Sequence, residues 1–127
     1  MRYFTMNGLL WRTIYVSPNS PLLVDRSGKL TVATTDPSTR CVYLSTELIG
    51  EFKTRVFIHE LGHCAMVSFN MLDDIHRMVY PEYWIEAEEY ICNFLADYGL
   101  RIFSIAYDVL GSNAMIFIPH EIEKLVG

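Results

Sequence analysis

Several features that would mark a specialised class of protein are scarce or missing in this sequence. It contains three cysteines in 127 residues, an odd number with no paired spacing, which argues against a disulfide framework and favours buried thiols in a reducing cytoplasm. Its 10 lysines and arginines form no cluster and are outnumbered by 15 acidic residues, so nucleic-acid binding through a basic face is not expected. No apolar run is long enough to cross a membrane, and the N-terminus does not resemble a secretory signal.

Repeats, low-complexity tracts and linker-like segments are also missing. The chain is 51% hydrophobic and 20% charged, which is typical of a folded globular protein. Its length suits one domain with a core of its own. We therefore expect a single cytoplasmic domain over residues 1–127, with no nucleic-acid or membrane partner and with an oligomeric state that the sequence leaves open.

The N-terminal third predicts a small, largely antiparallel sheet. Asn7-Gly8 is a strong two-residue turn signal, and it predicts a β-hairpin over residues 2–16. Further on, short apolar segments flank a second turn at Asp25 to Gly28, and a β-branched and aromatic segment predicts another strand. These segments are residues 22–24, 30–33 and 41–44.

Two helices are expected in the rest of the chain. The first spans about residues 51–69, with Ser45 or Thr46 as its cap, and it is apolar all round, which predicts that it is buried. Residues 70–80 look polar and irregular. Pro81 then suits the first turn of a second helix, whose apolar residues keep a 3.6-residue period as far as Leu110. The tail from Ala114 to Gly127 is compatible with a strand and a short helix, and the whole pattern predicts an α+β fold.

The first helix contains the sequence His-Glu-x-x-His. His59 and His63 lie four residues apart, so their imidazoles project from the same face of a helix and can bind one metal ion. Two imidazoles and an anionic ligand form a good tetrahedral Zn²⁺ site that leaves one position for water. Glu60 lies about 100° around the helix from His59, where its carboxylate can reach that water as a general base.

The third ligand has several candidates. Phe69 and Met66 stand where a longer metzincin motif would need histidine and glycine, which excludes that class. We expect four other carboxylates and histidines to be solvated, namely Asp73, Asp74, His76 and His120. The acidic cluster in the second helix is the better source: Glu86 belongs to a polar arc with Asn93 and Asp97, Glu88 points into an apolar arc, and Glu89 has the small residues Cys92 and Ala96 beside it.

The same cluster carries a family resemblance. His-Glu-Leu-Gly-His at 59–63, followed by Glu-x-x-Cys-Asn-x-x-Ala at 89–96, resembles the small zincin-fold metallopeptidases of the ImmA/IrrE type, over roughly residues 41–97. The resemblance implies a minimal zincin-like fold, in which a small sheet packs on the buried His-Glu-x-x-His helix and a second long helix supplies the third ligand. It implies that His59, His63 and Glu89 bind one Zn²⁺ per chain, that Glu60 is the catalytic base, and that the gene belongs to a phage or another mobile element.

We therefore expect a zinc metalloprotease, an endopeptidase that hydrolyses a peptide bond of a protein or peptide substrate, for example a regulatory protein. The alternative is a non-catalytic, zinc-stabilised protein-interaction module of a phage or mobile element. A zinc hydrolase acting on a non-peptide amide is a third hypothesis. Tyr83 and Tyr90 are candidates for the group that stabilises the oxyanion, although surface tyrosine is the simpler interpretation of each.

Overall fold

The computed structural model describes residues 1–115. Contacts divide the chain into two compact units, Met1–Asp97 and Tyr98–Gly127. The first unit contains the sheet and His59, Glu60, His63 and Glu89, so the predicted site lies within it. His120 and the tail predicted after residue 115 lie outside the described residues, and the prediction of one domain over 1–127 stays a prediction.

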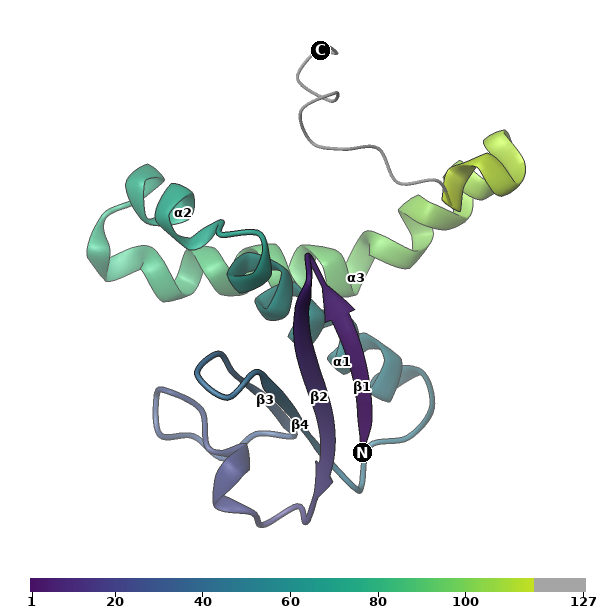
Figure 1. Ribbon diagram of the computed structural model, residues 1–127. Helices are drawn as coiled ribbons and strands as arrows, with labels where there is room; N and C mark the ends of the chain where they lie inside the picture. Colours follow the sequence, from purple (N-terminus) through teal and green to yellow (C-terminus); the bar gives the residue numbers. More distant parts are fainter. Residues whose placement is uncertain (116–127) are drawn as a thin grey trace. The chain divides into compact units, whose positions relative to one another are not determined.

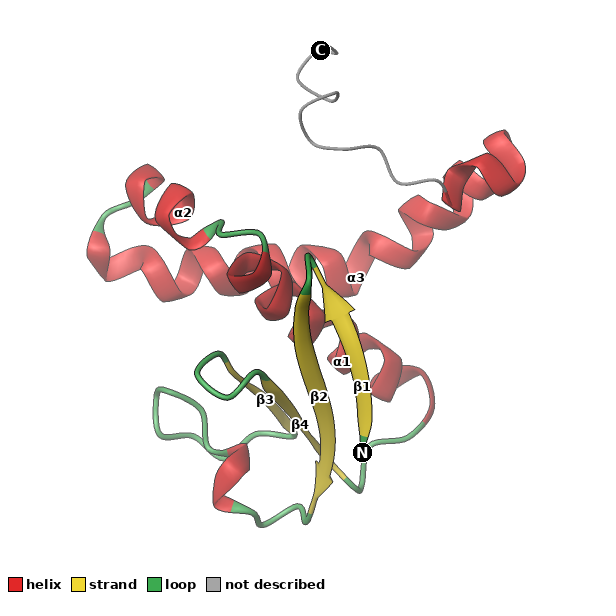
Figure 2. Cartoon of the chain, in the orientation of Figure 1, coloured by secondary structure: helices red, strands yellow, loops and turns green. Residues whose placement is uncertain are grey.

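The first unit is built on a four-stranded mixed sheet, shown in Figures 1 and 2. Its strands are β1 (Arg2–Met6), β2 (Leu9–Val16), β3 (Ala33–Asp36) and β4 (Cys41–Ser45), in the order β1-β2-β4-β3. The β1–β2 and β3–β4 pairs are antiparallel, whereas β2 and β4 are parallel. The α+β class is therefore confirmed, with a parallel pair at the centre of the sheet that the sequence did not predict.

The two predicted turns form, but only one of them joins two strands. Asn7 and Gly8 both have positive φ, at 50° and 78°, as a two-residue hairpin turn requires. The turn at Asp25 also forms, with a hydrogen bond of 3.0 Å from the Gly28 amide to the Asp25 carbonyl. The apolar segment before this turn is not a strand, because Pro21–Leu23 forms the 3₁₀ helix η1 and an isolated bridge joins Val24 to Leu30.

The predicted first helix is confirmed as α1 (Gly50–Ser68). Its cap differs from the prediction: the N-cap is Ile49, which makes no side-chain cap hydrogen bond, and Ser45 instead accepts a hydrogen bond from the Glu47 amide ahead of the helix. The first turn of α1 is exposed, with Phe52 55% exposed, so the helix is not buried along its whole length.

One side of α1 packs on the sheet, and the other side packs on two further helices. Towards the sheet, Cys64 joins a buried cluster with Trp11, Val42 and Leu44. The Trp11 indole N–H donates to the Ser68 hydroxyl at 2.9 Å, which ties β2 to the last turn of α1. α1 therefore lies between the sheet and these helices, as Figure 1 shows behind the β1–β2 hairpin.

The neighbours on the other side are α2 (Leu72–Met78) and the first part of α3 (Trp84–Leu110), which the 3₁₀ helix η2 (Pro81–Tyr83) precedes. The prediction that residues 70–80 are irregular is wrong, because α2 contributes Ile75 to a buried cluster with Met66 and Cys92. The three apolar residues of this helix, Leu72, Ile75 and Met78, are spaced three apart, but seven residues are too short a window for that period to predict a helix. The second predicted helix is confirmed, and it ends at Leu110 before Gly111, which begins η3 (Gly111–Met115) with a φ of 66°.

Within residues 1–115, no helix combines the length and the apolar character needed to cross a membrane.

Candidate metal centre

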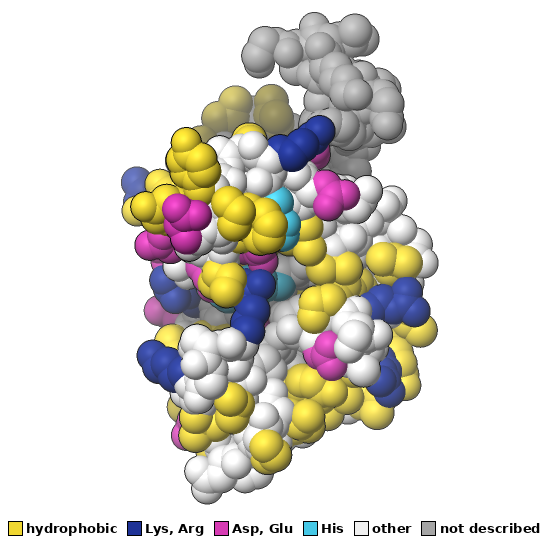
Figure 3. All heavy atoms as spheres, turned by 90° about the vertical axis from the view of Figure 1, so that its left-hand side faces the viewer, with side chains coloured by type: hydrophobic (Ala, Val, Ile, Leu, Met, Phe, Trp, Pro, Cys, Tyr) yellow, Lys and Arg dark blue, Asp and Glu magenta, His cyan; other side chains and the backbone are white. Residues whose placement is uncertain are grey.

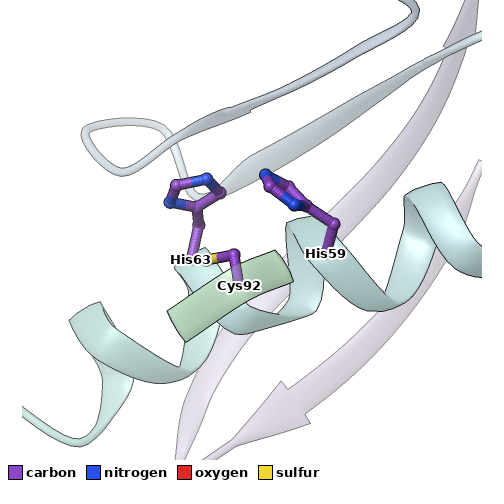
Figure 4. A group of neighbouring side chains, drawn as sticks. All are labelled: His59, His63 and Cys92. Carbon is purple, nitrogen blue, oxygen red and sulfur yellow. The ribbon is translucent and has the colours of Figure 1, made fainter. Parts of the chain in front are cut away.

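The two histidines of the motif lie as the sequence predicts. His59 and His63 project from the same side of α1, and Figure 4 shows both imidazoles there, with ring centroids 5.1 Å apart. Their side chains are 20% and 17% exposed, so the rings are neither free in solvent nor sealed in the core. Both line a cleft of about 780 Å³, and a ligand in that cleft can therefore reach them.

Glu89 joins the two histidines from α3. One carboxylate oxygen lies 2.9 Å from the His59 Nε2 atom, and the other lies 3.1 Å from the His63 Nε2 atom. The hydrogen bond with His59, followed by the one with His63, lowers the pKa of Glu89 well below its usual range. The same contact with Glu89 is the main reason that the pKa of His59 is raised.

These three side chains fit a zinc ion by donor type and by spacing. Two imidazole nitrogens and one carboxylate are a common set of protein ligands for catalytic zinc. With metal–ligand distances of about 2.0–2.2 Å, neighbouring ligand atoms in a tetrahedral site lie roughly 3.3–3.6 Å apart. The nitrogen–oxygen distances of 2.9 and 3.1 Å are shorter than this by only a few tenths of an ångström, so a small outward rotation of the side chains would suffice.

The approach of α3 to α1 depends on Gly62, inside the His-Glu-x-x-His motif. A Cβ atom built on Gly62 would lie 2.9 Å from the Cys92 Sγ atom and 3.2 Å from the Cys92 Cα atom. Any larger residue at position 62 would therefore push α3 away. Because Glu89 precedes Cys92 by one helical turn, this close approach also sets the distance between Glu89 and the histidines.

Asn93 is a site residue that sequence reasoning missed. It was assigned to a solvated polar arc of the second helix, yet its Oδ1 atom lies 2.9 Å from the His59 Nδ1 atom. With a metal bound, a hydrogen bond from Nδ1–H to this oxygen would leave Nε2 free of a proton and available as a ligand, which is how metal-bound histidines are usually oriented. The signal was the spacing, since Asn93 lies one turn after Glu89 on the same face of α3.

Glu60 lies at the same centre and is 4% exposed. Burial raises its pKa, and the nearby His63 and His59 oppose that shift. Glu60 also lines the cleft. A buried carboxylate with a raised pKa beside a metal site is suited to accept a proton and pass it on.

Glu88, the rival of Glu89, points elsewhere. Its side chain is 7% exposed, and its two oxygens lie 3.0 Å from the Arg26 Nη1 atom and 2.8 Å from the His76 Nε2 atom. His76 was expected to be a solvated loop histidine, but it belongs to α2 and stacks on Trp84 at 4.3 Å. Arg26 and His76 are thus the partners that a buried Glu88 requires, and neither could be located from the sequence.

The other predicted candidates are surface residues. Glu86, Asp73 and Asp74 are exposed. Tyr83 and Tyr90 are 50% and 76% exposed, and neither is among the residues that line the cleft.

Cys92 is the fourth side chain of interest. Its Sγ atom and the ligand nitrogens of His59 and His63 all lie within 4.8 Å of one another, so this group could also hold a metal ion. Cys92 is 0% exposed, however, and burial raises the pKa of its thiol. Figure 4 shows it against α1 itself, and it does not line the cleft.

Searches against protein-family models, curated proteins and solved structures found no match to this chain.

Proposed function

We propose that this chain is a zinc-dependent metallopeptidase with a minimal zincin-like fold, as its resemblance to the ImmA/IrrE type implies. One observation carries the proposal: Glu89 of α3 meets both Nε2 atoms of the His-Glu-x-x-His pair, at 2.9 and 3.1 Å. Two motifs separated along the chain thus converge on a single point. His59, His63 and Glu89 are the proposed ligands of one Zn²⁺, and one coordination position is left for water.

The chemistry requires a polarised carbonyl group and an activated water. His59, His63 and Glu89 would hold the zinc ion, which when bound would lower the pKa of a coordinated water and polarise the substrate carbonyl. Glu60 takes a proton from the water while the water oxygen bonds to the carbonyl carbon. Glu60 then gives that proton to the leaving nitrogen as the carbon–nitrogen bond breaks. Asn93 holds the tautomer and the orientation of His59 during these steps.

The cleft offers a place for an extended peptide. β3 is an edge strand of the sheet, and all four of its residues, Ala33–Asp36, line the cleft. β3 is also adjacent to the turn of α1 that carries Glu60, because the Thr35 hydroxyl donates to the Glu60 backbone carbonyl at 3.4 Å. A substrate segment that pairs with the free edge of β3 would therefore lie alongside His59, Glu60 and His63.

The direct test is the metal content of the purified protein. We expect about one zinc per chain, and we expect His59→Ala and His63→Ala to lose it, because each removes one of three protein ligands. His120→Ala serves as a control that also removes an imidazole but not a proposed ligand. Full zinc content in both site variants would refute the ligand assignment.

Catalysis is tested separately with Glu60→Gln. The amide keeps the size of the side chain but cannot take a proton, so zinc content should be unchanged while cleavage of fluorescently labelled casein falls about 10²–10⁴-fold. Equal cleavage by the wild type and the variant would exclude Glu60 as the base.

The alternative of a zinc-stabilised interaction module is favoured by one observation, the proximity of Cys92 to both histidines. If its thiolate bound the metal together with Glu89, four protein ligands would close the site, as in structural zinc centres. Cobalt substitution distinguishes the two: a sulfur ligand gives an intense near-ultraviolet charge-transfer band, and we expect none. Such a band, if Cys92→Ala abolished it, would support the interaction module over the peptidase.

A further inference from the structure

The cleft contains an arginine that neither the motif nor the ligand set explains. Arg26 projects from the turn at Asp25–Gly28 and lines the same cleft as His59 and His63. Figure 3 shows basic, acidic and histidine side chains gathered around the hollow on this face of the molecule. The Arg26 Nη1 atom lies 3.0 Å from Glu88, and its Nη2 atom lies 3.7 Å from the Glu89 oxygen that contacts His63.

Hydrogen bonds within the turn stabilise the backbone that carries Arg26. The Asp25 carboxylate accepts hydrogen bonds from the Ser27 amide at 2.9 Å, from the Ser27 hydroxyl at 2.6 Å and from the Lys29 amide at 3.0 Å. The Val24–Leu30 bridge closes the base of the turn. The backbone of Arg26 is therefore fixed by local contacts that do not involve the metal site.

The far end of the side chain is fixed by a buried anchor. Glu88 is 5% exposed and holds the guanidinium of Arg26 with one oxygen and His76 with the other. His76 is in turn held by stacking on Trp84 and by a hydrogen bond of 3.0 Å from the Trp84 indole to its carbonyl. Arg26 thus presents a guanidinium of defined orientation beside the ligands, which a solvated arginine would not do.

Donors remain free on that guanidinium. It has five N–H groups, of which the contacts with Glu88 and Glu89 involve only the two terminal nitrogens, and the Arg26 side chain is 49% exposed. A rigid donor in a cleft next to the site where negative charge develops is the arrangement that stabilises an oxyanion. Tyr83 and Tyr90 do not line the cleft, and Arg55, which does, is paired with Asp97 rather than with a ligand residue.

We propose that Arg26 is the residue that stabilises the oxyanion, donating from its guanidinium to the negatively charged oxygen formed when water adds to the substrate carbonyl. This inference rests on the proposed function. Glu88 and His76 are positioning residues for Arg26, and they act through it.

The test uses the cobalt-loaded protein and two small ligands, followed through the visible spectrum of the metal. Methylphosphonate resembles the tetrahedral oxyanion, whereas imidazole binds metal without presenting an anionic oxygen. We expect Arg26→Ala to keep its cobalt and to bind imidazole as the wild type does, but to bind methylphosphonate about ten- to a hundredfold more weakly, as the loss of a charge-assisted hydrogen bond implies. Arg26→Lys should recover only part of that affinity, because it restores the charge but not the planar fork.

Arg55→Ala is the matched control, since it removes the same charge from the same cleft. It should leave methylphosphonate affinity within about twofold of the wild type, because the Arg55 guanidinium pairs with Asp97 rather than with a ligand residue. Arg26→Ala should still fold because His76 continues to partner Glu88, and circular dichroism checks this.

Three results would overturn the inference. The first is unchanged methylphosphonate affinity in Arg26→Ala, and the second is an equal loss of methylphosphonate affinity in Arg26→Ala and Arg55→Ala. The third is loss of cobalt from Arg26→Ala, because that result would mean that Arg26 holds Glu89 in place as a ligand. Failure of the wild type to bind cobalt is a distinct outcome, because it would refute the proposed function itself and the inference with it.

Discussion

The close approach of Gly62 to Cys92 gives the sharpest test of how the two ligand-bearing helices are held together. Replacing Gly62 by alanine adds one methyl group inside α1. Helix propensity alone favours this change by about 1 kcal/mol, because glycine is a poor helix former. The added Cβ, however, would lie 2.9 Å from the Cys92 Sγ atom and 3.2 Å from its Cα atom.

The second of these distances decides the sign. A side-chain sulfur can rotate away, but the backbone of Cys92 moves only if α3 moves. Overpacking of this kind costs typically ~1–3 kcal/mol, which offsets or exceeds the gain in helix propensity. We therefore expect Gly62→Ala to destabilise the metal-free protein by up to about 2 kcal/mol in urea unfolding, and to weaken zinc binding by an order of magnitude or more, because a displaced α3 carries Glu89 with it.

Gly99→Ala is the matched control in α3. A Cβ atom there meets no described atom within 4 Å, so only the helix-propensity gain of up to about 1 kcal/mol should appear. The double variant Gly62→Ala/Cys92→Ala removes the clash with the sulfur but keeps the clash with the backbone of α3, and it should recover only part of the loss. If Gly62→Ala stabilised the protein as much as Gly99→Ala and left zinc affinity unchanged, the close approach of the helices would not be what positions Glu89.

Three further predictions concern single residues around the site. Among Glu86→Ala, Glu88→Ala and Glu89→Ala, only Glu89→Ala should weaken zinc binding by an order of magnitude or more in a titration of the metal-free protein. If Glu88→Ala showed that loss and Glu89→Ala bound zinc as the wild type does, Glu88 would be the third ligand instead. Asn93→Ala should lower zinc affinity about 10–100-fold while the fold is kept, because it frees the ring of His59; unchanged affinity would make the hydrogen bond incidental. In the native protein, Cys41, Cys64 and Cys92 should resist alkylation by iodoacetamide, because all three are buried and burial raises the pKa of Cys64 to about 12. Labelling of any of them at the rate of a free thiol would contradict this packing.

The sequence predicted the parts of the fold whose signals are local. The Asn7-Gly8 turn, the helix around His59 and the long helix after Pro81 each have a pattern that a window of a few residues can reveal, and each is confirmed. The position of His59 and His63 on one face follows from helical spacing alone. Glu89 was harder, since its candidacy rested partly on a family resemblance and on the small residues beside it.

What the sequence could not reveal depends on contacts between distant segments. The parallel pairing of β2 with β4 joins Arg12 to Cys41, and no local pattern encodes which strands become neighbours. The helix α2 is stabilised by packing of Ile75, a tertiary effect. The hydrogen bond between Arg26 and Glu88 spans 62 positions in the chain, so the role of that arginine became visible only when the turn and α3 were brought together.

The first part of α3 concentrates these long-range contacts in six residues. Glu88 faces the turn of Arg26 and the helix α2, while Glu89, about 100° further around the helix, faces the two histidines of α1. Cys92 then meets Gly62, and Asn93 meets His59. Because these contacts fix the rotation of α3 about its axis as well as its distance from α1, a shift of one residue in register would point Glu88 at the histidines and leave Arg26 without its anchor. Zinc that binds across α1 and α3 would therefore stabilise the same register that the packing selects, and metal binding should be coupled to the docking of α3 on α1.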